Sequence, residues 1–219
     1  MKPANFDGLA RAYQALEYLT FGHDLERARF ALLDRLADCR SILVLGEGDG
    51  RSLERLVRIA PEARMHCIDA SDTMLAKAQA RVAAVGAEQR VDFQCADALS
   101  LILPTAAYDA VVTLFFLDCF TPDQIDQLVG GIMRALKPEA YWLFSDFAIP
   151  ARGLSRARAR VWLAVLYAFF RWRTGLAVRS LPPSEETIER AGFRAEKTLE
   201  LQHGMLRTVW FRRQALAQT

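Results

Sequence analysis

Length and composition limit this chain to one compact domain. It has 219 residues, of which 52% are hydrophobic, and a net charge of +2 at pH 7. That content is enough to cover both faces of a parallel sheet around one core, and the small charge excludes a general attraction to nucleic acid. The first residues lack the apolar core of a signal peptide, and no apolar run approaches the roughly 20 residues that span a bilayer. We expect a single cytoplasmic domain over residues 1–219.

The four cysteines are far apart in the sequence: Cys39, Cys67, Cys95 and Cys119. None belongs to a C-x-x-C pair or has a histidine at ligand spacing, so the pattern predicts neither a zinc site nor a redox motif. We expect no metal, and buried thiols in a reducing compartment.

The N-terminal part shows helical spacing before the first strand. Apolar residues and one arginine recur on a single stripe: Leu25, Ala28, Arg29, Leu32, Leu33 and Leu36. This spacing predicts a helix that docks on the sheet.

The most informative segment is an apolar strand, residues 42–45, that runs into a glycine turn. The turn combines three glycines and two carboxylates: Gly46, Glu47, Gly48, Asp49 and Gly50. Glycine allows positive φ angles and a close approach of the backbone to a ligand. Dinucleotide loops place the third glycine three residues after the second, because a pyrophosphate sits on the helix N-terminus. Here the spacing is two, and two carboxylates suit a cationic cofactor better than a pyrophosphate.

The following elements alternate between strand and helix, as in a doubly wound sheet. Residues 64–69 form a second expected strand that ends in Asp69, about 20 residues beyond the first glycine, where a ribose-binding acid is expected. Ser71 and Thr121 are predicted helix N-caps. Further strands are expected at residues 91–95, 110–117 and 141–147, and a terminal hairpin pairs residues 193–201 with residues 206–212.

The order of these motifs is similar to that of class I S-adenosylmethionine-dependent methyltransferases, especially the small-molecule enzymes of ubiquinone and menaquinone biosynthesis. Four motifs carry the resemblance: the glycine turn, Ile68–Ser71, Cys95–Ala98 and Tyr108–Val112. It implies an α/β fold with a doubly wound, seven-stranded, mostly parallel sheet and a C-terminal antiparallel hairpin. It divides the domain into an N-terminal helical cap (1–40), a cofactor-binding core (41–147), a helical lid insertion (150–183) and a C-terminal helix with the hairpin (184–219).

The resemblance also implies a cofactor site for S-adenosylmethionine. The glycines would approach its methionine part, Asp69 would hold the ribose hydroxyls, and Asp97 would lie near the adenine amino group. The full implied set is Tyr13, Gly46, Glu47, Gly48, Gly50, Asp69, Ala70, Asp97, Ala98 and Phe115. Val44 departs from the pattern, because the family usually has an acid there. Glu47 or Asp49 would take over part of its work, or both are solvated loop carboxylates.

Candidate catalytic residues lie where strands end. Methyl transfer is an in-line displacement, so positioning supplies much of the acceleration, and a base is needed only if the acceptor loses a proton. Asp118, Asp146 and His203 are the candidates, and His23 could fold over the site; a capping or surface role is the alternative for each. No Asn/Asp-Pro-Pro-aromatic segment and no Pro-Cys pair follows the fourth strand, which leaves O-, N- or C-methylation of a small molecule.

Residues 150–184 form the most distinctive segment. It contains no Asp or Glu and seven arginines: Arg152, Arg156, Arg158, Arg160, Arg171, Arg173 and Arg179. Residues 161–170 are apolar around the whole helix circumference, and such a helix must bury more than one face. We interpret the segment as a lid over an apolar or aromatic acceptor pocket, whose arginines attract an acidic group. A homodimer contact and peripheral membrane contact through residues 155–173 remain open.

Together these patterns predict S-adenosylmethionine-dependent methyl transfer to a small, apolar or aromatic acceptor. Two alternatives stay open. One is a protein that binds S-adenosylmethionine without catalysis and acts as an interaction module, which Val44 and the lack of a clear base favour. The other is an NAD(P)-dependent oxidoreductase of similar topology, against which the glycine spacing counts.

Overall fold

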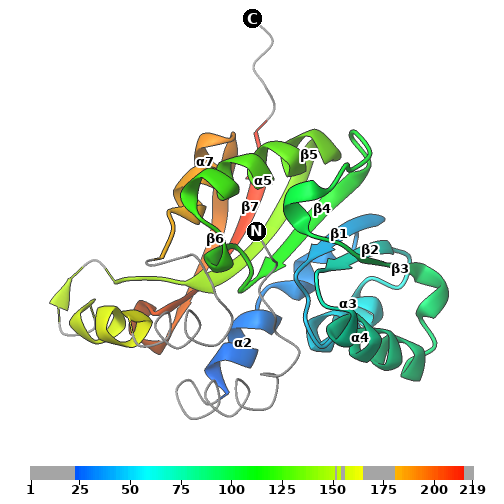
Figure 1. The fold of residues 1–219 in the computed structure, drawn as a ribbon, viewed down its shortest axis with the longest axis horizontal. Coiled ribbons are helices and arrows are strands. Elements are labelled where there is room, and N and C mark those ends of the chain that lie inside the picture. The colour runs from blue at the N-terminus through cyan, green and yellow to red at the C-terminus, as the bar shows by residue number, and fades with distance from the viewer. Residues whose placement is uncertain (1–22, 151, 154–155, 165–180, 215–219) are drawn as a thin grey trace, which may run out of the picture.

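A seven-stranded sheet organises the computed structural model, which describes residues 23–150, 152–153, 156–164 and 181–214 (Figure 1). The strands are β1 (Ser41–Leu45), β2 (Arg64–Asp69), β3 (Val91–Cys95), β4 (Tyr108–Leu114), β5 (Leu136–Phe147), β6 (Phe193–Leu201) and β7 (Leu206–Arg213). Their order is β3-β2-β1-β4-β5-β7-β6. In the described residues, β7 pairs antiparallel with β5 and β6, and the other pairings are parallel. The predicted mostly parallel sheet with a C-terminal antiparallel hairpin is confirmed.

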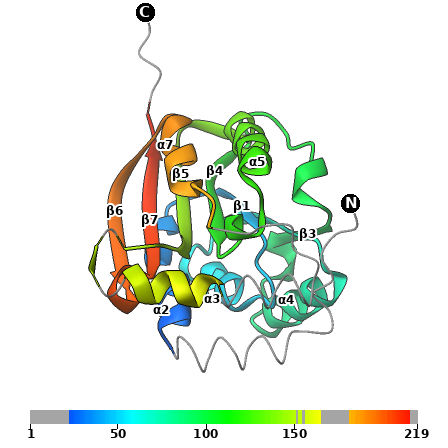
Figure 2. The same cartoon turned by 60° about the vertical axis from the view of Figure 1, so that its left-hand side comes forward.

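Helices cover both faces of the sheet (Figures 1 and 2). The labelled helices are α2 (Asp24–Phe30), α3 (Arg51–Ile59), α4 (Asp72–Ala84), α5 (Pro122–Ala135) and α7 (Ser184–Arg190), with 3-10 turns η1 (Leu33–Leu36), η2 (Glu88–Arg90), η3 (Ala98–Ser100), η4 (Leu117–Cys119) and η5 (Gln202–Gly204). Residues 156–164 are also helical. Apolar residues of α3, α4 and η1 pack in one buried cluster, and those of α5 and α7 pack in another. The chain is therefore a three-layer α/β structure.

The central strands are buried on both faces, which explains their unbroken apolar runs. Ile42 and Val44 of β1 belong to the cluster beneath α3 and α4, whereas Leu43 and Leu45 belong to the cluster beneath α5. Trp142 of β5 is fully buried, and its indole N–H donates to the Thr113 hydroxyl at 2.9 Å.

The predicted helix caps are confirmed. The Ser71 hydroxyl accepts from the Met74 amide at 3.2 Å at the start of α4. At the start of α5, Thr121 and Gln124 form a reciprocal capping box, and Pro122 occupies the first turn. Such caps satisfy amides that a helix leaves without a partner.

The continuous N-terminal helix predicted from the stripe of residues 25–36 is wrong. After α2, Ala31 is extended and Leu32 has a φ of 62°, so the helix ends before η1 begins. The break lets Leu25 pack near the ends of β5 and β7 while Leu33 packs in the cluster under α3 and α4. One straight helix could not bury both.

Three further expectations need correction. β4 ends at Leu114, and Phe115 leaves the extended conformation with a φ of 55°. β5 begins at Leu136 rather than at residue 141. Cys39 and Cys67 are buried as expected, but Cys95 is exposed because β3 is an edge strand.

Among the described residues, no helix is long and apolar enough to cross a membrane.

Candidate active site

The strand order reverses between β1 and β4, and ligands of open α/β sheets bind beyond the strand ends at such a point. The glycine turn lies there, with φ angles of 66° at Gly46, 72° at Gly48 and 87° at Gly50. A Cβ at Gly46 would overlap the Phe116 ring, and one at Gly50 would overlap the backbone of Ala78. A Cβ at Gly48 would meet nothing within 4 Å. Packing therefore requires two of the glycines, and Gly48 borders open space.

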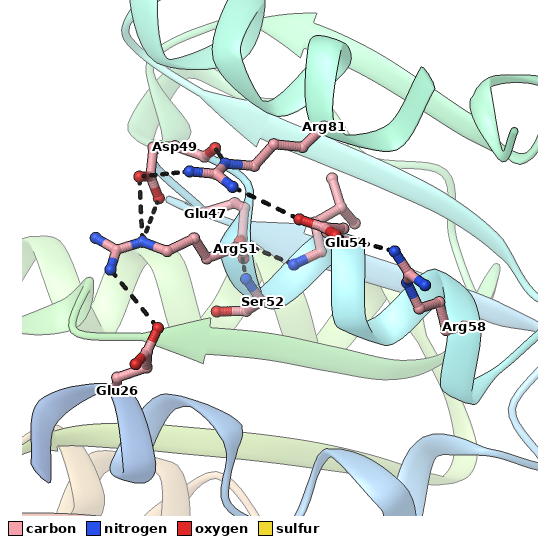
Figure 3. Close-up of polar contacts among 9 residues, drawn as sticks. Glu26, Glu47, Asp49, Arg51, Ser52, Glu54, Arg58 and Arg81 are labelled. Carbon is pink, nitrogen blue, oxygen red and sulfur yellow. Dashed lines mark hydrogen bonds and ion pairs between the residues drawn. The ribbon is translucent and has the colours of Figure 1, made fainter. Parts of the chain in front are cut away.

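Glu47 points into the protein and caps α3 (Figure 3). It is 4% exposed, and its Oε1 accepts from the Ser52 amide at 2.8 Å and the Leu53 amide at 2.9 Å. Burial raises the pKa of Glu47 to about 7, although both amides and the charge of Arg29 oppose the shift. A pyrophosphate would need these amides at the helix N-terminus. Their occupation by Glu47 counts against the nicotinamide alternative.

Asp49 joins the loop to two helices. Its Oδ1 lies 3.1 Å from Arg51 Nε, and its Oδ2 lies 3.6 Å from Arg81 Nη2 on α4. Arg51 also reaches Glu26 of α2 at 3.8 Å (Figure 3). The Asp49 side chain is 11% exposed, so neither it nor Glu47 is a solvated loop carboxylate. Whether either one also attracts the cofactor stays a prediction.

Asp69 ends β2 and Asp97 follows β3, so both lie at the same edge of the sheet as the glycine turn. Asp69 Oδ2 accepts from the Gly48 amide at 3.0 Å, and Oδ1 accepts from the Ser71 amide at 2.9 Å. Asp97 is exposed, and its Oδ1 accepts from the Leu99 amide at 3.0 Å. Of the neighbouring alanines, Ala70 is exposed and Ala98 is half-buried. Their proposed roles toward ribose and adenine stay predictions.

Asp118 and Asp146 are brought together at the ends of β4 and β5. They are 7% and 2% exposed, and the Asp118 amide donates to Asp146 Oδ2 at 3.1 Å. The Phe147 amide donates to Asp146 Oδ1 at 2.8 Å. Burial raises the pKa of Asp146 well above its ordinary value, the negative charge of Asp118 adds to this shift, and the two amides oppose it. Burial of the two carboxyls beside each other therefore favours the neutral form of Asp146.

Aromatic residues cover this edge next to the two carboxyls. The rings of Phe115 and Phe147 meet edge to face, with centroids 5.2 Å apart. Phe147 shares a buried cluster with Leu25 and Ala28 of α2 and with Ala159 and Leu163 of the helix at residues 156–164. Figures 1 and 2 show α2 and the latter helix (yellow) at the same end of the sheet. This end of the sheet therefore carries an apolar, aromatic cluster next to the carboxyl pair.

The helix at residues 156–164 buries one face only. Ala159 and Leu163 are buried, but Val161 is 66% exposed. The expectation that this helix buries more than one face does not hold for these residues. Residues 165–173 lie outside the described part of the chain, so a dimer or membrane contact there stays a prediction.

Both predicted histidines are exposed. His203 lies on η5, the turn between β6 and β7, with a φ of 57°. Met205, just after this turn, accepts from the Ala148 amide beyond β5 at 2.9 Å, so the turn lies at the expected edge. His23 is exposed just before α2 and makes no side-chain cap. Tyr13 lies outside the described residues. Arg29, whose guanidinium carbon lies 5.3 Å from the centroid of the Phe115 ring, was not among the predicted site residues, although it is the one cation in the apolar stripe of residues 25–36 used for the prediction.

Comparisons with known proteins decide the family. The model of a family described as "Methyltransferase domain" matches residues 42–139. A demethylmenaquinone methyltransferase of Thermus thermophilus is 32% identical over 191 residues, which cover 84% of each chain. This chain belongs to the class I S-adenosylmethionine-dependent methyltransferases. Its cofactor is S-adenosylmethionine.

Solved methyltransferases share the fold of this methyltransferase. An O-methyltransferase family protein from Burkholderia thailandensis has a TM-score of 0.73 and 17% identity, covering 95% of this chain and 61% of that one. This methyltransferase thus spans about three fifths of that structure. A 1,6-didemethyltoxoflavin-N1-methyltransferase from the same organism, with 1,6-didemethyltoxoflavin and S-adenosylhomocysteine bound, has a TM-score of 0.67 and 16% identity, covering 95% of this chain and 86% of that one.

Proposed function

We propose that this methyltransferase transfers the methyl group of S-adenosylmethionine to a small acceptor with an apolar, aromatic ring system. The observation that carries the proposal is the aromatic edge at the carboxyl ends of β4 and β5. There, Phe115 and Phe147 pack under α2 and the helix at residues 156–164. Apolar and aromatic side chains are typical of pockets for small apolar ligands. The Thermus relative is named for demethylmenaquinone, a quinone, which agrees with this class.

Asp118 is the proposed general base. Its side chain is buried, and it lies in η4, which follows β4 and the two residues Phe115 and Phe116. In the proposed reaction the bond between sulfur and the methyl carbon breaks while the bond from the acceptor atom to that carbon forms. The acceptor proton passes to the Asp118 carboxylate. Asp146 accepts the Asp118 amide and so positions the base. A base placed this way contributes about 10²–10⁴-fold.

Closure of the apolar edge would exclude water from the sulfonium. The helix at residues 156–164 contributes Ala159 and Leu163 to the cover, and α2 contributes Leu25 and Ala28. We therefore propose the lid role for this helix. Exclusion of water would favour transfer to the acceptor over hydrolysis and would strengthen electrostatic interactions in the site.

Transfer of a labelled methyl group tests the proposal. The protein is incubated with methyl-labelled S-adenosylmethionine and an acceptor panel. The panel contains demethylmenaquinone that carries a short side chain, simple hydroxylated aromatic compounds, and the carboxylated counterpart of each. Sugars form a separate group of acceptors. We expect label in the aromatic acceptors and a lower KM for the more apolar member of each pair. Label that enters only the sugars, or none of the panel, would contradict the acceptor class.

A further inference from the structure

Helix α5 contains two adjacent glycines. Gly130 and Gly131 lie in the interior of the helix, where glycine lowers helix stability relative to alanine. Among the described residues, a Cβ at Gly130 would meet only the Arg134 guanidinium, at 3.8 Å, and a Cβ at Gly131 would meet the same group at 4.0 Å. Both are ordinary contact distances, so alanine would fit at either position. Packing within the described part of the chain therefore does not account for this destabilising pair.

Gly130 is the centre of the exposed face of α5. Residues three, four or seven positions apart share one face of a helix. On this face Asp123, Asp126 and Gln127 precede Gly130 and Arg134 follows it, and these four polar residues are exposed. The opposite face of α5 is buried against the sheet. Because the exposed face has no side chain at its centre, another backbone can approach it closely.

An apolar hollow adjoins the Gly131 side of this face. It is open, has a volume of about 400 Å³, and lies between α5 and the loop after β3. Its lining is mostly aliphatic: Leu45, Leu99, Leu101, Leu103, Leu128 and Ile132. Ile102 belongs to the same loop but does not line the hollow, and it is 99% exposed. A single exposed apolar residue is ordinary, but this one lies beside an apolar hollow on the same surface.

The charges of α5 match those of a second copy of the helix in antiparallel orientation. Asp126 lies four residues before Gly130, and Arg134 lies four residues after it. A two-fold axis at Gly130 therefore places Asp126 of each copy opposite Arg134 of the other. A parallel orientation would place Asp126 opposite Asp126. Asp126 also lies 3.6 Å from Arg190, but both side chains of that pair are more than half exposed and accessible to a partner.

We propose that this chain forms a homodimer through α5 and the loop at residues 99–103. Gly130 lies at the two-fold axis, and Ile102 of each copy enters the hollow of the other. Such an axis keeps the two loops on the same side of the helix pair, so that each loop meets the other. The contact is separate from the helix at residues 156–164, which lies apart from α5 in Figures 1 and 2. An interface of this small size predicts weak association that depends on concentration.

Analytical ultracentrifugation over a range of protein concentrations tests the dimer. We expect the wild type to pass from monomer to dimer as its concentration rises. Ile102→Asp should raise the dissociation constant by about tenfold or more, because a charge would enter the apolar hollow. Val161→Asp is the matched control, because Val161 is also a branched apolar residue and is 66% exposed on the helix at residues 156–164. It should leave the dissociation constant unchanged.

Gly130→Gln separates the contact from the fold. Glutamine is a good helix former, and its Cβ has room on the exposed face. The variant should therefore melt at a higher temperature than the wild type at a dilution where both are monomers. Its side chain at the axis should still raise the dissociation constant of the dimer by about tenfold or more. A variant that melts higher and dimerises like the wild type would overturn the close helix contact.

Exchange of the two charges tests the orientation of the helices. Asp126→Arg and Arg134→Asp should each weaken the dimer by about threefold to tenfold, because each change places like charges opposite each other. The double variant should recover most of the wild-type affinity. Three results would each overturn the proposal: no recovery in the double variant, a wild type that is still monomeric at about 1 mM, or a dimer that Val161→Asp disrupts and Ile102→Asp does not.

Discussion

Glu47 shows how one buried carboxyl can stabilise a loop and still carry a cost. It caps α3 through two amides, yet burial raises its pKa from 4.5 to about 7. Because the folded protein holds this proton more tightly than the unfolded chain, the stability contribution is full below pH 4.5. It declines as pH rises toward about 7.

Glu47→Gln tests this account, because glutamine keeps an acceptor for the amides and does not titrate. We expect the free energy of unfolding of the variant, relative to wild type, to rise by about 3 kcal/mol between pH 4.5 and pH 8. If the glutamine oxygen is a weaker acceptor for the two amides, the free energy of unfolding of the variant falls by the same amount at every pH. The change between pH 4.5 and pH 8 is then unaffected. Urea unfolding at several pH values measures it. Glu62→Gln, which removes a carboxylate from an exposed ion pair with Arg40, is the control. A difference in the free energy of unfolding between Glu47→Gln and wild type that stays constant over this pH range would refute the buried-charge explanation.

The carboxyl pair divides into a base and a positioning residue. We expect Asp118→Asn to lower kcat by about 10²–10⁴-fold, with unchanged affinity for S-adenosylhomocysteine. Asp146→Asn should instead reduce the melting temperature. The NH2 group of asparagine would face one of the two backbone N–H groups from which Asp146 accepts hydrogen bonds, and that hydrogen bond would be lost. Steady-state kinetics and melting, with exposed Asp123→Asn as the control, measure both. A wild-type kcat in Asp118→Asn would remove it from the mechanism.

Residue types and spacing predicted the positions of these acids but not all of their partners. Asp69 and Asp146 lie at the ends of their strands and Asp118 follows β4, and parallel strands bring their carboxyl ends to one edge. The direction in which Glu47 points depends on the φ angles of the turn, which the sequence does not specify. His203 was expected at the same edge, and the turn is there, but its side chain is exposed.

At the level of elements, the glycine turn packs α3 against α4. A Cβ at Gly50 would overlap the Ala78 backbone, whereas one at Gly86 would meet no atom within 4 Å. Both glycines have positive φ, at 87° and 69°. They form a matched pair that separates steric overlap from backbone strain.

We expect Gly86→Ala to cost about 1 kcal/mol from its left-handed backbone alone. Gly50→Ala should cost that amount plus about 1–3 kcal/mol for overpacking against α4. Chemical unfolding of both variants measures the difference. Equal costs would mean that α4 can shift to make room, which would contradict a rigid contact between α3 and α4.

Elements with strong local signals were predicted best. The caps at Ser71 and Thr121 and the apolar central strands follow from local chemistry and periodicity, and the structure confirms them. The break after α2 could not be predicted, because helical spacing continues through Leu32 into Leu33 and Leu36. Burial in two separate clusters overrides that local preference.

Across the whole molecule, one edge of the sheet collects the functional groups. The glycine turn, Asp69 and the carboxyl pair lie at the carboxyl ends of parallel strands there, and α2 and the helix at residues 156–164 cover the same end (Figure 2). Gln202 of η5 links these two helices, since it donates to Asp24 at 2.6 Å and accepts from Arg158 at 3.2 Å. The fold thus places the glycine turn and the carboxyl pair next to an apolar cover, as the proposed function requires.

Titration of S-adenosylhomocysteine into the wild type and Gly48→Val tests the central claim most directly. Gly86→Val is the control, because Gly86 has the same backbone region and the same open surroundings. The account predicts that wild type and Gly86→Val bind, and that Gly48→Val folds but gives no binding heat, because its side chain fills the space kept for the cofactor. Binding by Gly48→Val with wild-type affinity, or no binding by the wild type, would contradict a cofactor site at this glycine turn.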